Sequence, residues 1–560
     1  MAIPIKDDLT THNDTNEVRM MFFKNSARYK NKTTRRLGGE SEAEPRTGAS
    51  ASINPSLADN INFIKNELGN SPDIIIRLFE IGANQTQAGA VYLDGITDKE
   101  MVNQFILHSL MIDAGAGVSL DQDQSVLTFI QTNVLTIGEV YVLKDWDHII
   151  LSVLSGDTVI FIENSSEAIS GNTKGGEQRA ITEPSSQVVI RGPKEGFTES
   201  IGTNVSLVRR RIKSSYIRLE PYKIGRHTQT TVAIMYIQGT VDDSLVRELR
   251  TRLQNIQIEA LAGSEHLEEL LQDQRMTPFS TLLNTERPDT VTGHLLEGRI
   301  AIFIDGTPFN LIAPVTFFMN FESVEDYYQR PEAASAILFL RYAALIISLF
   351  GPSIYIAAIT FHQEMIPTPL LLSLAAQRES VPIPAFIEAI IMEFTFEILR
   401  EAGIRMPRAI GQAVSIVGAL VLGQAAVEAG IISSAMVIVV ALTGISSFAI
   451  PSYNMALSIR LIRFSMMGAA ALLGFYGIAI LSIIILGHLC GLTSLGIPYM
   501  TFMSGYVPED QRKTLFGLSL ISNALKPELS AKSLSSKADR EDDPDSPVLP
   551  SKSINGSGPQ

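Results

Sequence analysis

Apolar and polar residues are distributed very unevenly along this 560-residue chain. Residues 1–55 and 508–560 are polar and poor in large apolar side chains, whereas the densest apolar block lies between Ala333 and Leu489. Between these extremes, residues 56–290 carry short apolar runs separated by polar stretches. Segments that are too poor in apolar residues to bury a core stay disordered, so we expect disordered tails at both ends.

Residues 56–170 and 185–290 are predicted to form two small α/β subdomains. In both ranges, short apolar runs typical of buried strands alternate with segments of helical spacing, and this alternation is typical of α/β domains. The strand candidates are 90–94, 139–143, 157–162, 188–190 and 230–237. The polar, glycine-containing segment 169–187 is the expected boundary between the two subdomains.

Residues 291–330 are predicted to form a β-hairpin and a linker. Two apolar runs, 299–304 and 309–313, flank the sequence Asp305-Gly-Thr-Pro308. Because this sequence would break a membrane helix and suits a tight turn, we expect a hairpin here instead of a membrane span.

Residues 331–507 are predicted to form an α-helical membrane domain with four or five spanning helices. Four apolar segments have about the 20 residues that a bilayer requires. They are 336–361, 410–427, 431–450 and 464–488. The fold class expected for the whole chain is therefore a multi-domain protein in which a cytoplasmic α/β region with two subdomains precedes a polytopic helical domain.

A fifth segment, 381–400, is ambiguous because it contains Glu388, Glu393 and Glu397. Basic residues lie near the span ends, at Arg330, Arg341, Arg400, Arg405, Arg408, Arg460 and Arg463. The positive-inside rule places all of them in the cytoplasm only if 381–400 crosses the membrane. If the segment lies in the interface instead, four spans return the C-terminus to the cytoplasm, and the sequence leaves both topologies open.

Composition and missing motifs exclude several classes of protein. The net charge of −14 argues against a general nucleic-acid binder, and the single cysteine, Cys490, allows no intramolecular disulfide. Residues 1–36 are polar and basic, without the apolar core of a secretion signal. The sequence also lacks the motifs of a P-loop, a zinc protease and a serine nucleophile. We therefore expect no enzyme activity, no cofactor and no metal.

Segment 410–429 contains the candidates for an ion path. On a helix with about 100° per residue, one face carries the pore-lining candidates Val414, Val417, Val421, Gln424 and Glu428. The adjacent face carries small residues, which let helices pack closely in lipid. Apolar constrictions gate pores by dewetting, and acidic rings favour cations. The alternative is that the valines face lipid and Glu428 lies at the interface, and spacing alone does not decide between them.

Glu393, Glu397 and Arg400 share one face of segment 381–400. Carboxylates at membrane depth are costly unless they face water or a partner. This face therefore either lines an aqueous path or lies at the membrane surface as an interfacial helix. Glu397 and Arg400 are spaced to pair with each other on a helix.

Many separate motifs between about residues 74 and 507 resemble the A-subunit family of GerA-type receptors of bacterial spores. In the soluble region they comprise Glu183, Pro184, Arg191, Gly192, Pro193, Glu195, Gly196, Phe197, Asn204, Arg209 and Arg210. Further motifs are Thr285-Glu-Arg-Pro-Asp289, Asp305-Gly-Thr-Pro308, 399–405, 418–426 and Gly496-Ile-Pro-Tyr499. Gln187 departs from the pattern, which has an acidic residue after Glu-Pro, and this puts a local ion pair in doubt.

The resemblance implies a multi-pass protein of the inner membrane of the endospore, with its N-terminal region in the cytoplasm. It implies two partners, a transporter-like B subunit that binds the nutrient and a lipoprotein C subunit. It also implies a homo-oligomer, a pentamer by family resemblance, that forms a ligand-gated cation channel and starts germination. Two alternatives stay open, a membrane-anchored signalling or scaffold subunit and a secondary transporter component, although no internal repeat typical of transporters is visible.

Overall fold

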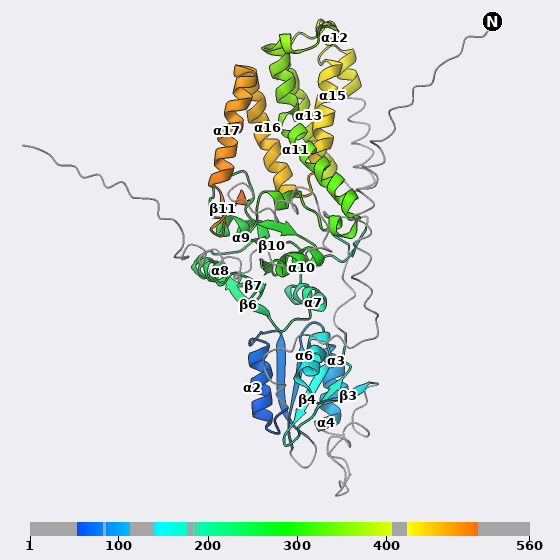
Figure 1. Ribbon diagram of the computed structural model, residues 1–560, viewed down its shortest axis with the longest axis vertical. Coiled ribbons are helices and arrows are strands. Elements are labelled where there is room, and N and C mark those ends of the chain that lie inside the picture. Colours follow the sequence, from blue (N-terminus) through cyan, green and yellow to red (C-terminus); the bar gives the residue numbers. More distant parts are fainter. Residues whose placement is uncertain are drawn as a thin grey trace, which may run out of the picture. The chain divides into compact units, whose positions relative to one another are not determined.

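The computed structural model describes residues 53–81, 86–111, 139–175, 183–184, 187, 189, 191–405 and 423–501. Two α/β units and a group of long helices follow one another along this part of the chain (Figure 1). The predicted fold class, an α/β region with two subdomains followed by a helical domain, is confirmed. The predicted disordered tails lie outside the described residues, apart from residues 53–55.

The first unit is a five-stranded antiparallel sheet with helices on both faces. Its strands are β1 (Ile74–Ile81), β2 (Thr86–Leu93), β3 (Val140–Leu143), β4 (Thr158–Ile162) and β5 (Ala168–Gly171), in the order β1-β2-β4-β5-β3. Its helices are α2 (Leu57–Glu67), α3 (Lys99–Met101), the π-helix η1 (Val102–His108), α4 (Ser109–Met111) and α6 (Trp146–Ser155). Apolar side chains of α2 and α6 cover one face of the sheet, and those of η1 and α4 cover the other.

The second unit repeats this architecture. Its strands are β6 (Ile217–Ile224), β7 (Thr230–Ile237), β8 (Leu283–Thr285), β9 (Ile300–Ile304) and β10 (Asn310–Ala313), in the order β6-β7-β9-β10-β8. Helices α7 (Ile201–Arg211) and α10 (Pro288–Leu296) pack on one face, and α8 (Asp243–Asn255) and α9 (Ser264–Leu271) on the other. The hairpin predicted within 291–330 forms as β9 and β10. It belongs to this sheet, because β9 pairs with β7 and β10 pairs with β8, and both of its strands are buried.

A buried ion pair connects the two α/β units. The Nε of Arg209, in α7, donates to the carboxylate of Asp73, just before β1, at 2.8 Å, and its Nη2 donates to Ser71 Oγ at 3.0 Å. The side chains of Arg209 and Asp73 are only 2% and 8% exposed. Removing one partner of a buried pair leaves the other charge without compensation, which is strongly destabilising.

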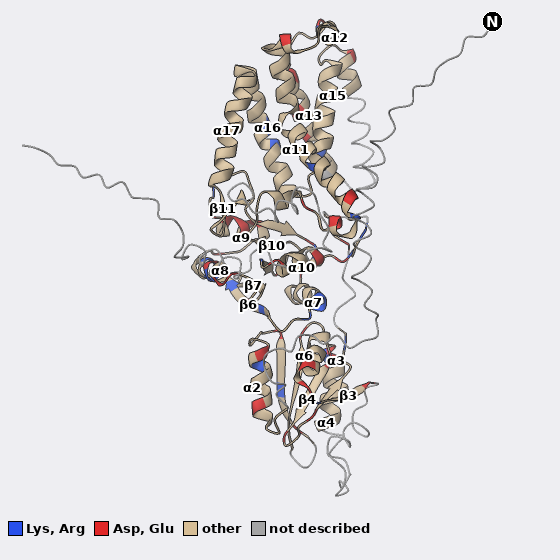
Figure 2. Cartoon of the chain, in the orientation of Figure 1, with Lys and Arg blue, Asp and Glu red and all other residues tan. Residues whose placement is uncertain are grey.

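The helical part follows the second α/β unit along the chain. Its described helices are α11 (Pro331–Thr360), α12 (Thr368–Arg378), α13 (Ala385–Arg405), α15 (Ser434–Phe448), α16 (Tyr453–Leu473) and α17 (Phe475–Gly491). Among the described residues, α11 and α16 are long and apolar enough to cross a membrane, and α15 and α17 are shorter apolar helices. Figure 2 shows that charged residues are sparse on α11, α15, α16 and α17.

The span predicted at 464–488 is wrong as a single helix. Gly474 ends α16 with φ 60° and ψ −138°, and α17 begins at the next residue. A Cβ at this position would lie 2.6 Å from His362 Cε1, so the turn requires both the conformational freedom and the small size of glycine. α16 also begins earlier than predicted, at Tyr453 after the N-cap Ser452, so it includes Arg460 and Arg463, which the prediction places beside a span end.

The segment that follows α17 is hydrogen-bonded to the second α/β unit. The carboxylate of Asp273 accepts hydrogen bonds from Arg252, in α8, from Thr493 Oγ1 and from the backbone N–H of Gly496 at 3.0 Å. Burial opposes ionisation of Asp273, but these donors outweigh it and hold its pKa below the usual value. Ser494 Oγ also donates to the carbonyl of Thr281 at 2.6 Å. The segment that follows α17 is thus attached directly to the second α/β unit.

Arg209→Gln should lower stability because it leaves Asp73 buried without an opposite charge. We expect a loss of about 3 kcal/mol, seen as a lower midpoint of thermal unfolding of the purified chain. Lys194→Gln is the control, because Lys194 and Glu183 form a pair whose side chains are 60% and 58% exposed, and its loss should cost less than about 1 kcal/mol. Equal midpoints for both variants would contradict a stabilising role of the buried pair.

Candidate functional site

Five charged side chains meet between α13 and α16, inside the helical part, and form what we name the charge cluster. Its members are Glu393, Glu397 and Arg400 of α13 and Arg460 and Arg463 of α16. Arg463 Nη2 lies 2.8 Å from Glu393 Oε2 and 3.6 Å from Glu397 Oε1. Glu397 Oε2 lies 2.5 Å from Arg400 Nη2 and 3.7 Å from Arg460 Nη1.

The centre of the charge cluster is completely enclosed. The side chains of Arg463 and Glu393 are 0% and 1% exposed, whereas those of Arg400 and Glu397 are 13% and 20% exposed. Both carboxylate oxygens of Glu393 and all three guanidinium nitrogens of Arg463 are buried without a hydrogen bond to any described residue, although they face each other as an ion pair. The cluster therefore has hydrogen-bonding capacity that water or a rearranged partner would fill.

Spacing along each helix produces this arrangement. Glu393 and Glu397 are one turn apart on α13, and Arg460 and Arg463 are one turn apart on α16, so the two pairs face each other where the helices pack. The ion pairs direct the carboxylates of α13 toward α16, into the contact between the two helices. Such a cluster can fix one helix against another, and it can respond to water or ions that reach it.

A second buried carboxylate, Glu388, lies earlier in α13. Its Oε1 accepts hydrogen bonds from the backbone N–H of Ser433 at 2.6 Å and from Ser433 Oγ at 2.5 Å, and Arg378 Nη1 lies 3.8 Å from its Oε2. Because Ser433 is the N-cap of α15, Glu388 holds the beginning of that helix. Glu388 is thus bound to α15 by the same kind of buried polar contact that joins α13 to α16.

The pore-lining candidates are only partly described. Val414, Val417 and Val421 lie outside the described residues, so their orientation stays a prediction. Gln424 and Glu428 are exposed on a helical turn, and Gln424 Nε2 donates to Glu428 Oε1 at 2.8 Å. The polar end of the predicted face is therefore on the surface of the isolated chain.

The motif residues of the soluble region mostly hold the backbone of the second α/β unit. Asn204 is completely buried, and its Oδ1 accepts from the N–H of Thr198 at 2.7 Å while its Nδ2 donates to the carbonyl of Thr198 at 2.6 Å. Arg209 binds Asp73, and Arg210 Nη2 donates to the carbonyl of Gly175 at 2.8 Å. These contacts fix α7 and its preceding loop.

The remaining motif residues lie in and around the same loop. Phe197 packs edge-on against Phe303, Glu195 pairs with Arg211 at 2.7 Å, and Glu183 pairs with Lys194 at 3.2 Å. Pro184 and Gly196 are buried, Arg191 and Gly192 are exposed, and the carbonyl of Pro193 accepts from Arg287. At position 187, where the sequence departs from the family pattern, Gln187 Oε1 accepts a hydrogen bond from Thr285 Oγ1 at 2.8 Å. Arg287 forms its ion pair with Asp289, at 2.6 Å. It therefore needs no acidic partner at position 187, and the neutral side chain of Gln187 fits there.

The sequence interpretation found one half of the charge cluster and missed the other. Glu393, Glu397 and Arg400 were identified from their shared helical face, but Arg460 and Arg463 were assigned to a span end. Glu393 and Glu397 are four residues apart and Arg460 and Arg463 are three apart, so each pair lies on one face of its helix, but no sequence signal shows that these two helices pack together. In the described part of the chain, no group of three His, Cys, Asp or Glu residues is placed to hold a metal ion.

Two α/β subdomains followed by a helical part with an internal charge cluster define a multi-domain protein, and two of its described helices are long and apolar enough to cross a membrane. The chain belongs to the Bacillus/Clostridium GerA spore germination protein family, whose model matches residues 62–529. The resemblance found in the sequence motifs is thereby confirmed.

Individual relatives match most of the chain. Spore germination protein KA of Bacillus subtilis (strain 168) is 47% identical over 477 residues, which cover 85% of this chain and 87% of that protein. Spore germination protein GerLA of Bacillus cereus is 38% identical over 438 residues, covering 78% and 88%. The crystal structure of the N-terminal domain of the A subunit of the Bacillus megaterium spore germinant receptor GerK3 is 42% identical, covers 48% of this chain and 99% of that chain, and has a TM-score of 0.39.

Arg463→Met should destabilise the helical part because Glu393 then stays buried without a neighbouring cation. We expect a cost of about 3 kcal/mol, measured as a lower midpoint of thermal unfolding in detergent. The double variant Arg463→Met with Glu393→Met removes both charges and should recover most of the loss. Arg405→Gln, which removes an arginine whose side chain is 79% exposed, is the control and should leave the midpoint unchanged. A double variant no more stable than Arg463→Met would show that Glu393 does not compensate Arg463.

Proposed function

We propose that this chain is the A subunit of a nutrient receptor in the inner membrane of the bacterial endospore, and that several copies form a ligand-gated cation channel. Membership of the GerA family and relatives named as spore germination proteins support the process. Helices α11 and α16, both long and apolar enough to cross a bilayer, support the membrane location. The proposed partners are a transporter-like B subunit that binds the nutrient and a lipoprotein C subunit.

The charge cluster is the observation that carries the channel proposal. Charged side chains at membrane depth are costly, and they usually face partners or water and mark ion pathways or moving elements. Glu393 and Arg463 are enclosed between α13 and α16, and their atoms lack hydrogen bonds to the described residues. We expect α13 to have two arrangements relative to α16, and the ion pairs of the charge cluster stabilise one of them.

The exposed pair Gln424 and Glu428 supports an oligomer. Both side chains lie on the surface of the single chain, next to apolar helices such as α15. Polar side chains in a membrane domain are stable when they face a water-filled lumen or another subunit. A closed ring, a pentamer by family resemblance, would give one helix of each copy to the lumen, with Val414, Val417 and Val421 as the apolar part of the path.

The alternative is a membrane-anchored scaffold subunit that conducts no ions. The hydrogen bonds that attach the segment after α17 to the second α/β unit are compatible with a scaffold as well as with a channel. A secondary transporter component is disfavoured by the lack of an internal repeat in the sequence. Measuring ion conduction by variants of the proposed pore face distinguishes the channel hypothesis from the scaffold hypothesis.

Val417→Ala and Val421→Ala should each make spores leaky. Smaller side chains widen an apolar constriction and admit water, which lowers the barrier to ions. We expect premature loss of cations and germination without nutrient, measured as potassium release from dormant spores. Ile438→Val, at a position of α15 that is 68% exposed, is the control and should leave dormancy unchanged. Valine variants with normal protein levels and parental dormancy would refute the pore assignment.

Glu428→Gln should weaken the preference for cations without changing gating. The substitution removes a charge but little volume, and a ring of carboxylates attracts cations to a pore. In liposomes containing the leaky Val417→Ala chain, adding Glu428→Gln should shift the reversal potential in a potassium chloride gradient toward zero. Arg405→Gln provides the control for an exposed charge. An unchanged reversal potential would place Glu428 outside the ion path.

A further inference from the structure

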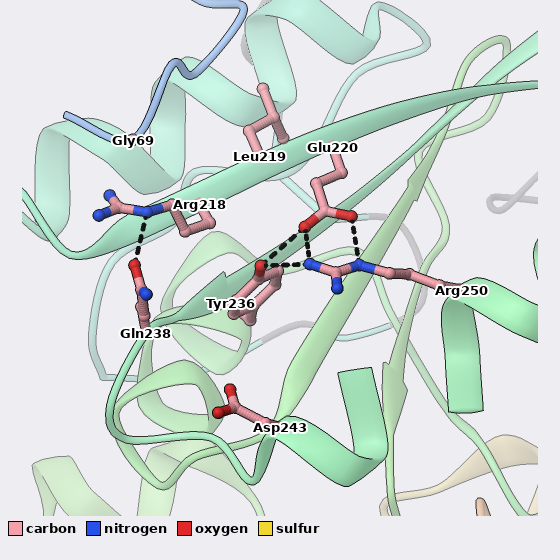
Figure 3. A pocket seen from close by; sticks show the side chains of 8 residues that line it. All are labelled: Gly69, Arg218, Leu219, Glu220, Tyr236, Gln238, Asp243 and Arg250. Atoms are coloured by element: carbon pink, nitrogen blue, oxygen red, sulfur yellow. Dashed lines mark hydrogen bonds and ion pairs between the residues drawn. The ribbon is translucent and has the colours of Figure 1, made fainter. Parts of the chain in front are cut away.

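A polar pocket of about 380 Å³ lies at the edge of the second sheet (Figure 3). It is bordered by β6 and β7, by α8 and by the turn after α2. Its lining residues are Gly69, Arg218, Leu219, Glu220, Tyr236, Gln238, Asp243 and Arg250. This volume is at the lower end of the range for small-molecule sites, which suits a ligand of a few heavy atoms.

One pair of charges in the pocket is already compensated. Arg250 Nε and Nη2 donate to the two carboxylate oxygens of Glu220 at 2.8 and 2.5 Å, and Tyr236 and Tyr222 donate to the same oxygens at 2.7 and 3.0 Å. Burial and the hydrogen bond to Glu220 raise the pKa of Tyr236 to about 12, so its hydroxyl stays a donor. Glu220 and Arg250 therefore form a wall of the pocket in which the two charges compensate each other.

Arg218 differs from Arg250 in that its hydrogen-bond acceptors are neutral groups instead of a carboxylate. Its Nε donates to Gln238 Oε1 at 2.8 Å, and its Nη1 donates to the carbonyls of Ser215 and Ile217 at 2.6 and 3.2 Å. All three acceptors are neutral, and Nη2 makes no hydrogen bond to a described residue. Within the described part of the chain, Arg218 forms no ion pair, although Glu67 is near enough to favour its charge. Burial lowers the pKa of Arg218, so an anion beside it would be stabilising.

The turn after α2 brings the backbone close to this guanidinium. Gly69 has φ +69°, and a Cβ built on it would lie 2.2 Å from Arg218 Nε. Only glycine allows both this backbone conformation and this contact. The guanidinium is thus held between the turn and Gln238, with Nη2 as the nitrogen left for a ligand (Figure 3).

We propose that the pocket binds a small molecule with a single carboxylate, and that Arg218 is its anchor. The two N–H groups on Nη2 can donate to a carboxylate, and a guanidinium keeps its positive charge at neutral pH. The carboxylate of Asp243 on the pocket lining is exposed and disfavours polyanions such as phosphate. A neutral or cationic group at the other end of the ligand would meet Asp243 favourably. This site is independent of the proposed channel, because its residues all lie in the α/β region.

Binding of acetate, glycine and inorganic phosphate to the purified full chain tests the proposal. Saturation-transfer NMR, at constant ionic strength with chloride as the balancing anion, should give signals from acetate and glycine that saturate with concentration. Arg218→Gln should lower both signals at least fivefold. Arg226→Gln removes an exposed arginine from the turn between β6 and β7, outside the pocket lining, and should change them less than twofold. Equal signals in the parent and Arg218→Gln, or none from the parent, would overturn the site.

Asp243→Asn tests the selectivity of the same site. Removing the acidic side chain should strengthen phosphate competition against acetate at least threefold, and it should weaken glycine relative to acetate because the ammonium group loses its partner. Arg218→Lys keeps the positive charge and should retain part of the acetate signal, which distinguishes loss of the anchor from loss of folding. Unchanged competition in Asp243→Asn would refute the proposed orientation. Ion flux in liposomes would be unaffected by either outcome, so the channel proposal is tested separately.

Discussion

The guanidinium of Arg463 has no exposed surface, yet it lies among helices whose other side chains are mainly apolar. A charge in this position is tolerated only when an opposite charge is held against it. Glu393 meets this requirement at 2.8 Å, and Glu397, Arg400 and Arg460 extend the cluster toward the less buried end of the contact. These ion pairs therefore constrain the rotation of α13 about its axis relative to α16.

The helical part is also attached to the soluble region at a defined place. Asp273 collects donors from α8 and from the turn after α17, and Ser494 and Tyr499 donate to carbonyls of Thr281 and Ser280. The two α/β units are likewise joined to each other by the buried ion pair of Arg209 and Asp73. Direct hydrogen bonds thus connect the segment after α17 to the second α/β unit, and a buried ion pair connects that unit to the first.

Local patterns predicted much of the fold, and long-range pairing explains most of what they missed. The β9–β10 hairpin followed from Asp305-Gly-Thr-Pro308, and the polar face of α13 followed from Glu393, Glu397 and Arg400. The partners Arg460 and Arg463 could not be predicted, since charge near a span end ordinarily indicates contact with water. The break at Gly474 was hidden within uniformly apolar sequence, because it depends on backbone conformation and on contact with His362. The pocket at Arg218 combines residues from four separate segments, and no local motif marks it.

Accessibility of Gln424 in the assembled protein tests the central claim, that the 410–429 segment faces an aqueous lumen shared by several copies. Cys490 is the only cysteine, so Cys490→Ser gives a background in which Gln424→Cys and Ile438→Cys can be compared. In intact membranes, a membrane-impermeant thiol reagent should label the cysteine at position 424, mild oxidation should join neighbouring copies through it, and the cysteine at position 438 should do neither. A cysteine at position 424 that is neither labelled nor cross-linked, in protein of normal abundance, would contradict the account.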